Sequence, residues 1–207
     1  QEAIKRGSVA YIEADYKRQA SNLQEHLTMW DSFDLGLPEF TSALQPQKET
    51  VVAVVDTGVD YAHPALKDYV LPGYDFVEED TDAMDEQGHG THVAGITLRG
   101  ANYKGVKILP VRVLDEKGMG SDSHIASGIY YAVDQGATVI NMSLGGQGLS
   151  QTQRDAILYA LAHDVSVVVA AGNEAEEIYN KYPASERDVL TIGASSKKKP
   201  LTDFSNF

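Results

Sequence analysis

Short apolar runs rich in valine and isoleucine recur from about residue 50 onward, separated by longer amphipathic segments. The runs are nearly continuous rather than alternating, as expected for strands buried on both faces of a sheet. Strands are therefore predicted at Val51–Val55, Ile108–Leu114, Val139–Met142, Ser166–Ala171 and Val189–Gly193.

The amphipathic segments between these runs predict helices at His89–Leu98, Ser121–Gln135 and Gln151–His163. Gly136 follows the second as a helix-ending residue, and Ser150 with Gln153 fits a capping box at the start of the third. Strands that alternate with helices predict an α/β fold, with three layers and a mainly parallel β-sheet covered by helices on both faces. In such folds, functional sites lie at the carboxyl ends of the strands.

The first 50 residues follow a different pattern. The segment SVAYIEAD (8–15) alternates like a strand, whereas YKRQASN (16–22) is polar and predicts a loop. Residues 21–48 predict a short helix around Leu23–Trp30, followed by a connector that contains proline and glutamine.

The amino-acid composition excludes several classes of function and site. The chain has 207 residues, 43% of them hydrophobic, which is enough for one domain with a sizeable core. A net charge of -13 repels phosphate backbones and argues against a nucleic-acid partner. No cysteine is present, so neither disulfides nor thiolate metal sites form, and no apolar run approaches the ~20 residues of a membrane span.

Asp56 ends the first predicted strand, in the sequence VVAVVDTG. A carboxylate in this position is partly desolvated and needs a hydrogen-bonding partner. Taken alone, the segment is consistent with a turn-capping aspartate or with the DTG of an aspartic protease. The second interpretation needs two carboxylates that share a proton, and therefore a homodimer, because the chain has no second DTG or DSG.

The segment GHGTHVAG (88–95) places His89 at the start of a predicted helix, between glycines that let other backbone and a substrate approach closely. Zinc binding by His89 and His92 is the alternative, but no acid of the H-E-x-x-H type accompanies the pair. Two further strands end in small residues, as SLGG (143–146) and AAGN (170–173). The amide of Asn173 is able to donate to an oxyanion, although Gly172-Asn173 alone is also a common turn.

These four motifs, in this order, resemble the subtilisin-like serine protease family (subtilases) over roughly residues 50–207. The resemblance implies a serine endopeptidase that acts through an acyl-enzyme. His89 is then the general base, Asp56 orients its ring and stabilises the imidazolium, and Asn173 stabilises the tetrahedral oxyanion.

The resemblance also implies that an extended peptide substrate pairs as an added strand with Ser143–Gly145 and Gly118–Gly120, which predicts broad sequence specificity. Lys181 is expected at the base of the specificity pocket, where it would shorten the pocket or favour an acidic or hydroxyl-bearing side chain of the substrate, unless Glu174 neutralises it. The predicted substrate-binding residues are Ser143, Leu144, Gly145, Gly118, Gly120, Ala171, Gly172 and Lys181.

The family carries its nucleophile in a G-T-S-M-A-like segment that follows the asparagine, and this sequence contains no G-T-S. The chain as given is therefore expected to be inactive alone. The explanations are a truncated domain, a C-terminal fragment that carries the serine as a partner, or an inserted domain. A non-catalytic subtilase-like module that binds extended peptides is the alternative function.

SVAYIEAD resembles the last strand of a subtilase propeptide. We therefore expect residues 1–20 to be the C-terminal tail of a propeptide, lying in the cleft like a product, and residues 21–207 to form the peptidase domain. The processing junction is predicted near Gln19–Asn22. The partners implied are this propeptide and protein or peptide substrates, and the implied location is secreted, with an intracellular subtilase as the alternative.

The acidic segment 75–85 runs directly into the His89 motif. It resembles a calcium loop of thermitase-like members of the family, in which Asp75, Asp80 and Asp82 would converge on a structural calcium ion. A solvated acidic loop is the alternative.

Overall fold

The computed structural model describes residues 17–20, 49–101, 105–196 and 200–207. The strands are β1 (Lys17–Ala20), β2 (Thr50–Asp56), β3 (Tyr74–Asp75), β4 (Val106–Arg112), β5 (Met119–Ser121), β6 (Val139–Met142), β7 (Leu144–Gln147), β8 (Ser166–Ala170), β9 (Lys181–Tyr182) and β10 (Leu190–Ile192). The helices are α4 (His89–Gly100), α5 (Asp122–Asp134), α6 (Gln151–Ala162) and the 3-10 turn η1 (Ile178–Asn180).

A six-stranded sheet forms the centre of the molecule, in the order β10-β8-β6-β2-β4-β3. All of its neighbouring strands are parallel, as the continuous apolar runs predicted. Since parallel strands share one carboxyl edge, Asp56 at the end of β2 lies beside the ends of β4 and β6. This edge is where the motifs were expected.

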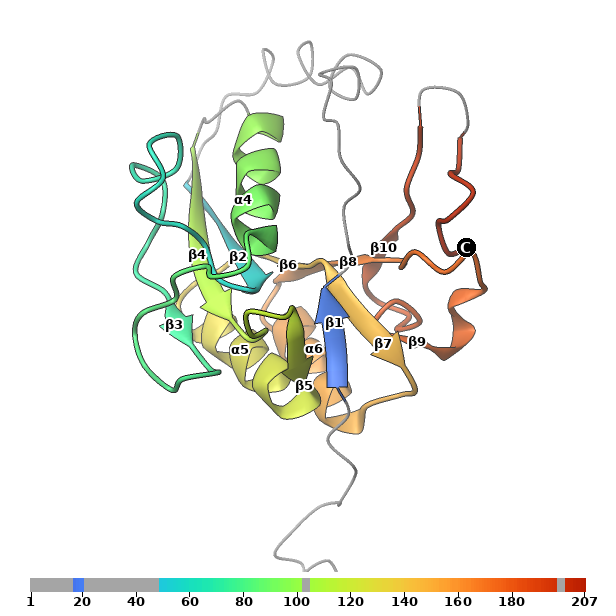
Figure 1. Ribbon diagram of the computed structural model, residues 1–207. Coiled ribbons are helices and arrows are strands. Elements are labelled where there is room, and N and C mark those ends of the chain that lie inside the picture. Colours follow the sequence, from blue (N-terminus) through green and yellow to red (C-terminus); the bar gives the residue numbers. More distant parts are fainter. Residues whose placement is uncertain (1–16, 21–48, 102–104, 197–199) are drawn as a thin grey trace, which may run out of the picture.

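Helices cover both faces of this sheet (Figure 1). Ala53 and Val55 of β2 pack with residues of α5 and α6, whereas Val52 and Val54 pack with residues of α4. The alternation follows from the two-residue period of a strand, which sends successive side chains to opposite faces. The predicted three-layer α/β architecture is therefore confirmed.

Helix starts follow their local sequence. Ser121 caps α5 by accepting from the amide of His124, and Ser150 caps α6 by accepting from the amide of Gln153. The reciprocal half of the predicted capping box is wrong, because the Gln153 side chain donates to Asp122 at 2.6 Å instead, and its Oε1 has no hydrogen-bond partner among the described residues. A buried carboxylate attracts this amide more strongly than the cap does.

A second, antiparallel sheet lies at one end of the central sheet, in the order β5-β1-β7-β9. The prediction of a loop at residues 16–22 is wrong for Lys17–Ala20, which form the strand β1 (Figure 1). Main-chain pairing on both edges holds β1, so its polar side chains do not prevent it from being a strand. The predicted strand at 8–15 and the predicted helix at 23–30 lie outside the described residues.

Candidate active site

The side chains of Asp56 and His89 meet at the carboxyl edge of the central sheet. The Nδ1 atom of His89 lies 2.7 Å from Oδ1 of Asp56, and both residues are buried. The same Oδ1 accepts from the amide of Thr57 at 2.8 Å. Burial raises the pKa of Asp56 above its ordinary value, although the bonds from His89 and Thr57 pull it down. Because a carboxylate accepts at Nδ1, the other ring nitrogen of His89 is left to take up a proton.

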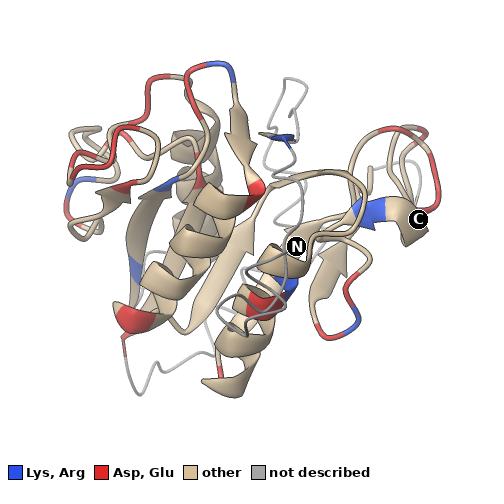
Figure 2. Ribbon diagram, turned by 90° about the horizontal axis from the view of Figure 1, so that it is seen from below, with Lys and Arg blue, Asp and Glu red and all other residues tan. Residues whose placement is uncertain are grey.

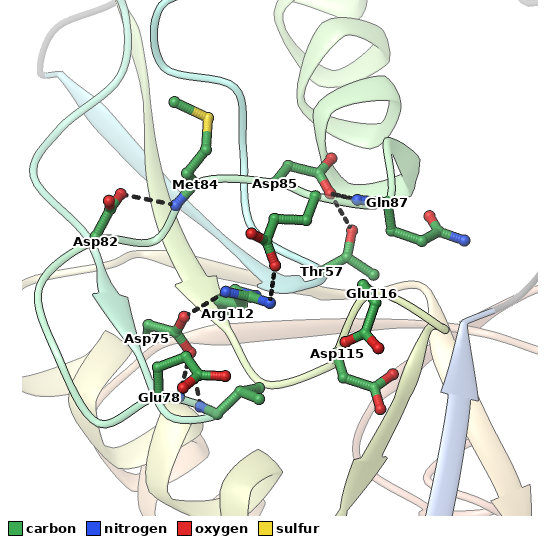
Figure 3. A network of polar contacts seen from close by, with 12 residues as sticks. Thr57, Asp75, Glu78, Asp82, Met84, Asp85, Gln87, Arg112, Asp115 and Glu116 are labelled. Atoms are coloured by element: carbon green, nitrogen blue, oxygen red, sulfur yellow. Dashed lines mark hydrogen bonds and ion pairs between the residues drawn. The ribbon is translucent and has the colours of Figure 1, made fainter.

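Asp85 joins the end of β2 to the start of α4 (Figure 3). Its Oδ1 accepts from the hydroxyl of Thr57 at 2.9 Å, and its Oδ2 accepts from the hydroxyl of Thr91 at 2.6 Å. The amides of Gln87, Gly88 and Thr91 also donate to this carboxylate. The amide of Gly90 in turn donates to Thr57 Oγ1 at 3.0 Å. The carboxylate of Asp85 therefore connects the end of β2, which carries Asp56, to the start of α4, which carries His89. Asp56 and His89 are called the dyad below.

The His89 helix approaches β2 very closely. A Cβ built at Gly90 would lie 2.1 Å from the carbonyl oxygen of Gly58 and 3.1 Å from Cβ of Asp56. No side chain fits at this point, so the glycine in GHG is required by the short distance between helix and strand.

The predicted oxyanion residue Asn173 follows β8 in the next loop along the sheet. Asn206, which is buried, holds this loop in place: its Nδ2 donates to the carbonyl of Ala171 at 2.9 Å and its Oδ1 accepts from the amide of Glu174 at 3.0 Å. The amide of Asn206 also donates to the carbonyl of Gly172. The loop that carries Asn173 therefore depends on the last residues of the chain.

Strand β1 occupies the groove between β5 and β7, with Arg18 opposite Gly120 and Ala20 opposite Leu144. These are strands where the sequence predicted an extended substrate. The amide of Ala20 donates to the carbonyl of Gly118 at 2.9 Å.

The C-terminal end of β1 points toward the dyad. A Cβ built at Gly118 would contact both the Ala20 side chain and the Gln87 amide, and Gln87 accepts from the His89 amide. A cavity of about 360 Å³ lies beside β1 and is lined by Leu144, Gly145, Ala171, Gly172, Asn173 and Lys181, among others. The structure thus brings together predicted substrate-binding residues from four separate segments of the chain.

Lys181 lies in this cavity wall, but it is not a free positive charge. Its Nζ lies 3.3 Å from Oε2 of Glu174 and 3.1 Å from Oε2 of Glu176. Burial by itself lowers the pKa of Lys181, yet the bonds to Glu176 and Glu174 outweigh it and raise the pKa. The peptide bond Tyr182–Pro183, next to this lysine, is cis.

The aspartates of the predicted calcium loop are engaged differently from metal ligands, as Figure 3 shows for Asp75 and Asp82. Asp75 is buried and its Oδ2 accepts from Arg112 at 2.7 Å, while its Oδ1 accepts from the amides of Val77 and Glu78. Asp80 and Asp82 accept from loop amides on the surface. Nowhere in the described segments do three His, Asp or Glu side chains gather as a metal site. As arranged, Arg112 takes the place at Asp75 that a cation would need, so the calcium site stays a prediction.

The zinc alternative finds no support in the arrangement of the two histidines. His89 Nδ1 is directed at Asp56, and the part of the chain that the structure describes supplies no group of three potential ligands around His89 and His92.

Several residues of the site were missed by the sequence analysis: Thr57, Asp85, Arg18, Asp122, Gln153 and Asn206. Asp85 carries a local signal, because an aspartate three residues before Gly88 at a helix start is typical of a capping turn. Asn206 and the Arg18–Asp122 pair carry none, since their side-chain contacts join residues 30 to 104 positions apart.

The comparisons with known proteins agree with this geometry. The family described as "Subtilase family" matches residues 47–207. A "Thermophilic serine proteinase" of Bacillus sp. (strain AK1) is 44% identical over 75% of the chain, and a "Cell wall-associated protease" of Bacillus subtilis (strain 168) is 45% identical over 77%. The crystal structure of a cold adapted subtilisin-like serine proteinase matches with a TM-score of 0.71 and 36% identity, over 79% of this chain and 62% of that one.

The match is partial from the relatives' side. The chain spans 41% of the length of the thermophilic proteinase and 19% of the length of the cell wall-associated protease. The activity of a whole protein therefore does not pass directly to these 207 residues.

Proposed function

The chain belongs to the subtilase family, and from this premise we propose that it forms part of a serine endopeptidase that hydrolyses peptide bonds through an acyl-enzyme. The observation that carries the proposal is the buried His89–Asp56 pair at 2.7 Å, beside a groove that holds an extended strand. An aspartic protease is overturned by the family match, and by a carboxylate whose partner is a histidine rather than a second aspartate.

In this proposal, His89 removes the proton from a serine hydroxyl and then delivers it to the leaving amine. Asp56 keeps the proton on Nδ1, which leaves the other nitrogen as the base, and it stabilises the imidazolium that forms. Asn173 donates its amide to the oxyanion of the tetrahedral intermediate. The serine comes from a segment that is not among these 207 residues, because the sequence holds no G-T-S.

We further propose that residues 1–20 act as the tail of a propeptide and 21–207 as the peptidase domain. Support comes from Lys17–Ala20, which lie between β5 and β7 with their C-terminal end toward the dyad, as a product would. Autoinhibition follows, because a peptide substrate needs the same main-chain donors and acceptors of Gly118 and Gly145.

Export from the cell and a structural calcium ion are further proposals. Relatives include the "Cell wall-associated protease" and an "Extracellular serine proteinase" of Thermus sp. (strain Rt41A), but also a "Major intracellular serine protease" of Bacillus subtilis. No helix among the described residues is long and apolar enough to span a membrane. Calcium, if bound, would use Asp80 and Asp82 and would require Asp75 to turn away from Arg112.

The second candidate function is a module that holds extended peptides without cutting them. The observation that favours it is the β1 strand, which is paired on both of its edges, in a chain without the G-T-S segment.

One experiment separates the two functions. The purified protein is treated with a fluorophosphonate serine probe, and its polypeptides are weighed by mass spectrometry under denaturing conditions. We expect the 22.5 kDa chain to stay unlabelled. We expect the label on a second polypeptide that carries the serine and is purified together with this chain. Labelling should be lost in His89→Ala and kept in the control His163→Ala, whose ring is exposed. Protein that never takes the label would support the binding module instead.

A further inference from the structure

The β1 strand carries a buried arginine. Along Lys17–Ala20 the side chains alternate between exposed and buried, and the side chain of Arg18 has no exposed surface. A fully buried arginine is rare unless acceptors surround its guanidinium. The walls of the groove must therefore supply those acceptors.

Acceptors from several described residues surround the guanidinium of Arg18. Nε and Nη2 form a fork on the two carboxylate oxygens of Asp122, at 2.5 and 3.1 Å. Nη1 donates to the carbonyl of Gln147 at 2.9 Å, and Nη2 donates to that of Gly148 at 3.2 Å. A planar group with five donors satisfies this set, whereas the three donors of a lysine ammonium do not match its geometry.

The walls of this pocket come from elements other than β1. Asp122 is the first residue of α5, where the helix dipole favours a negative charge, and it also accepts from Gln153 of α6 at 2.6 Å. Gly146 of β7 leaves room for the arginine, since a Cβ there would lie 3.0 Å from its Cδ. With the groove empty, the buried carboxylate of Asp122 would keep the Gln153 amide and lose its cationic partner.

The pocket has a fixed place along the groove. Arg18 lies two residues before Ala20, whose amide donates to the carbonyl of Gly118. Gly118 in turn lies next to Gln87, which accepts from the amide of His89. We infer that Asp122, Gln153 and the carbonyls of Gln147 and Gly148 form a subsite that selects arginine in the bound polypeptide, two residues N-terminal to the position of Ala20. The substrate class is thus polypeptides with arginine at that position. That such polypeptides are substrates rests on the proposed function, whereas their binding to this subsite does not.

This selectivity differs from what main-chain pairing alone provides. Pairing with Gly120 and Gly145 accepts almost any side chain, which led to the expectation of broad specificity. A peptide without a cation at this position leaves the buried carboxylate of Asp122 unpaired, and this lowers the affinity of that peptide.

The test measures binding of free peptides to the full chain. Because the chain's own β1 competes with the peptide for the groove, the experiment uses the variant Arg18→Asp. This change places a second carboxylate beside Asp122, and the repulsion between the two weakens the binding of β1 in the groove. A fluorescent peptide of residues 14–23 is titrated by anisotropy and compared with versions that carry citrulline or lysine in place of the arginine. The control peptide carries glutamine in place of Lys17, whose side chain is exposed. If Arg18→Asp does not fold by circular dichroism, Arg18→Ala replaces it.

We expect the arginine peptide to bind roughly 10- to 100-fold more tightly than the citrulline peptide, the effect of losing one or two charge-assisted hydrogen bonds. The Lys17 control should bind like the arginine peptide. Asp122→Asn should abolish the difference, whereas Asp155→Asn on α6 should keep it. Equal binding of the arginine and citrulline peptides, or no binding to a folded variant, would overturn the inference. Neither result depends on hydrolysis, which fluorophosphonate labelling reports separately.

Discussion

At the residue scale, the position of the His89–Asp56 pair depends on a third acidic residue. Asp85 accepts from the hydroxyls of Thr57 and Thr91 and from three amides at the start of α4. It touches neither member of the pair, so it is a positioning residue. Two predictions belong to this scale.

The first prediction concerns Asp85→Asn, which replaces an acceptor-only group with one that brings two donors toward other donors. We expect a loss of about 1–3 kcal/mol in the free energy of unfolding at pH 7, measured by urea titration. Burial alone would raise the pKa of Asp85, but the bonds from Thr91, Gly88 and Gln87 outweigh it and lower the pKa below 3.8.

The sign of the pH dependence follows from this shift. A lowered pKa in the folded state gives stability that is complete above pH 3.8 and is lost as the pH falls through the lower folded value. The difference between wild type and Asp85→Asn should therefore shrink in strong acid. Glu78→Gln, on the exposed part of the same loop, should show no such difference at any pH.

The second prediction concerns Lys181. Because Glu174 and Glu176 both pair with it, the wild-type pocket should show no preference for a glutamate over a leucine side chain in bound peptides. The double variant Glu174→Gln with Glu176→Gln should create that preference, measured as the ratio of the two peptides' Kd values. A glutamate preference in the wild type would show that the lysine acts on the ligand despite its partners.

At the element scale, the close packing of α4 against β2 determines which glycines are replaceable. Gly90→Ala places a Cβ 2.1 Å from the Gly58 carbonyl, so we expect a loss of about 1–3 kcal/mol or more in the free energy of unfolding. Gly95→Ala in the same helix meets nothing within 4 Å and should stabilise by about 0.5–1 kcal/mol. Urea unfolding of both variants checks this, and equal effects would mean that helix propensity rather than packing dominates.

The elements also show what the sequence was able to predict. Five of the six strands of the central sheet and the three helices followed from their apolar periods, because a strand buried on both faces is apolar along its whole length. The short edge strand β3 was not predicted, since Tyr74–Asp75 carries no apolar run. Asp56 and His89 were noticeable because one ends a strand and the other begins a helix, and their roles came from the resemblance of their motifs to those of subtilases. β1 was not, since its pairing uses the main chain and its one buried charge finds its partner 104 positions away.

At the scale of the whole molecule, the end of the chain supports the loop of Asn173. Asn206 is buried and bonds Ala171, Gly172 and Glu174 through its side chain and amide. We expect Asn206→Ala to cost about 2–4 kcal/mol in the free energy of unfolding, because several buried backbone groups lose their partner at once. Hydrogen exchange should show faster exchange at Glu174, while the exposed Asn180→Ala leaves that rate unchanged.

Charge is unevenly distributed over the molecule. Figure 2 shows that acidic positions recur in the loops on two sides of the molecule. With a net charge of -13, the surface attracts cationic peptides from a distance, so association with them should slow as salt is added. The same field would enrich arginine-containing segments near the groove before any pocket is engaged.

The attachment of β1 to the rest of the chain has a consequence for regulation. A strand joined through residues 21–48 cannot diffuse away, and an attached ligand acts at an effective concentration on the order of millimolar. A free peptide with identical contacts would have to reach that concentration to displace it. Cutting the connection once would convert the same strand into a dilute competitor, so a single covalent event, without any change in affinity, would open the groove.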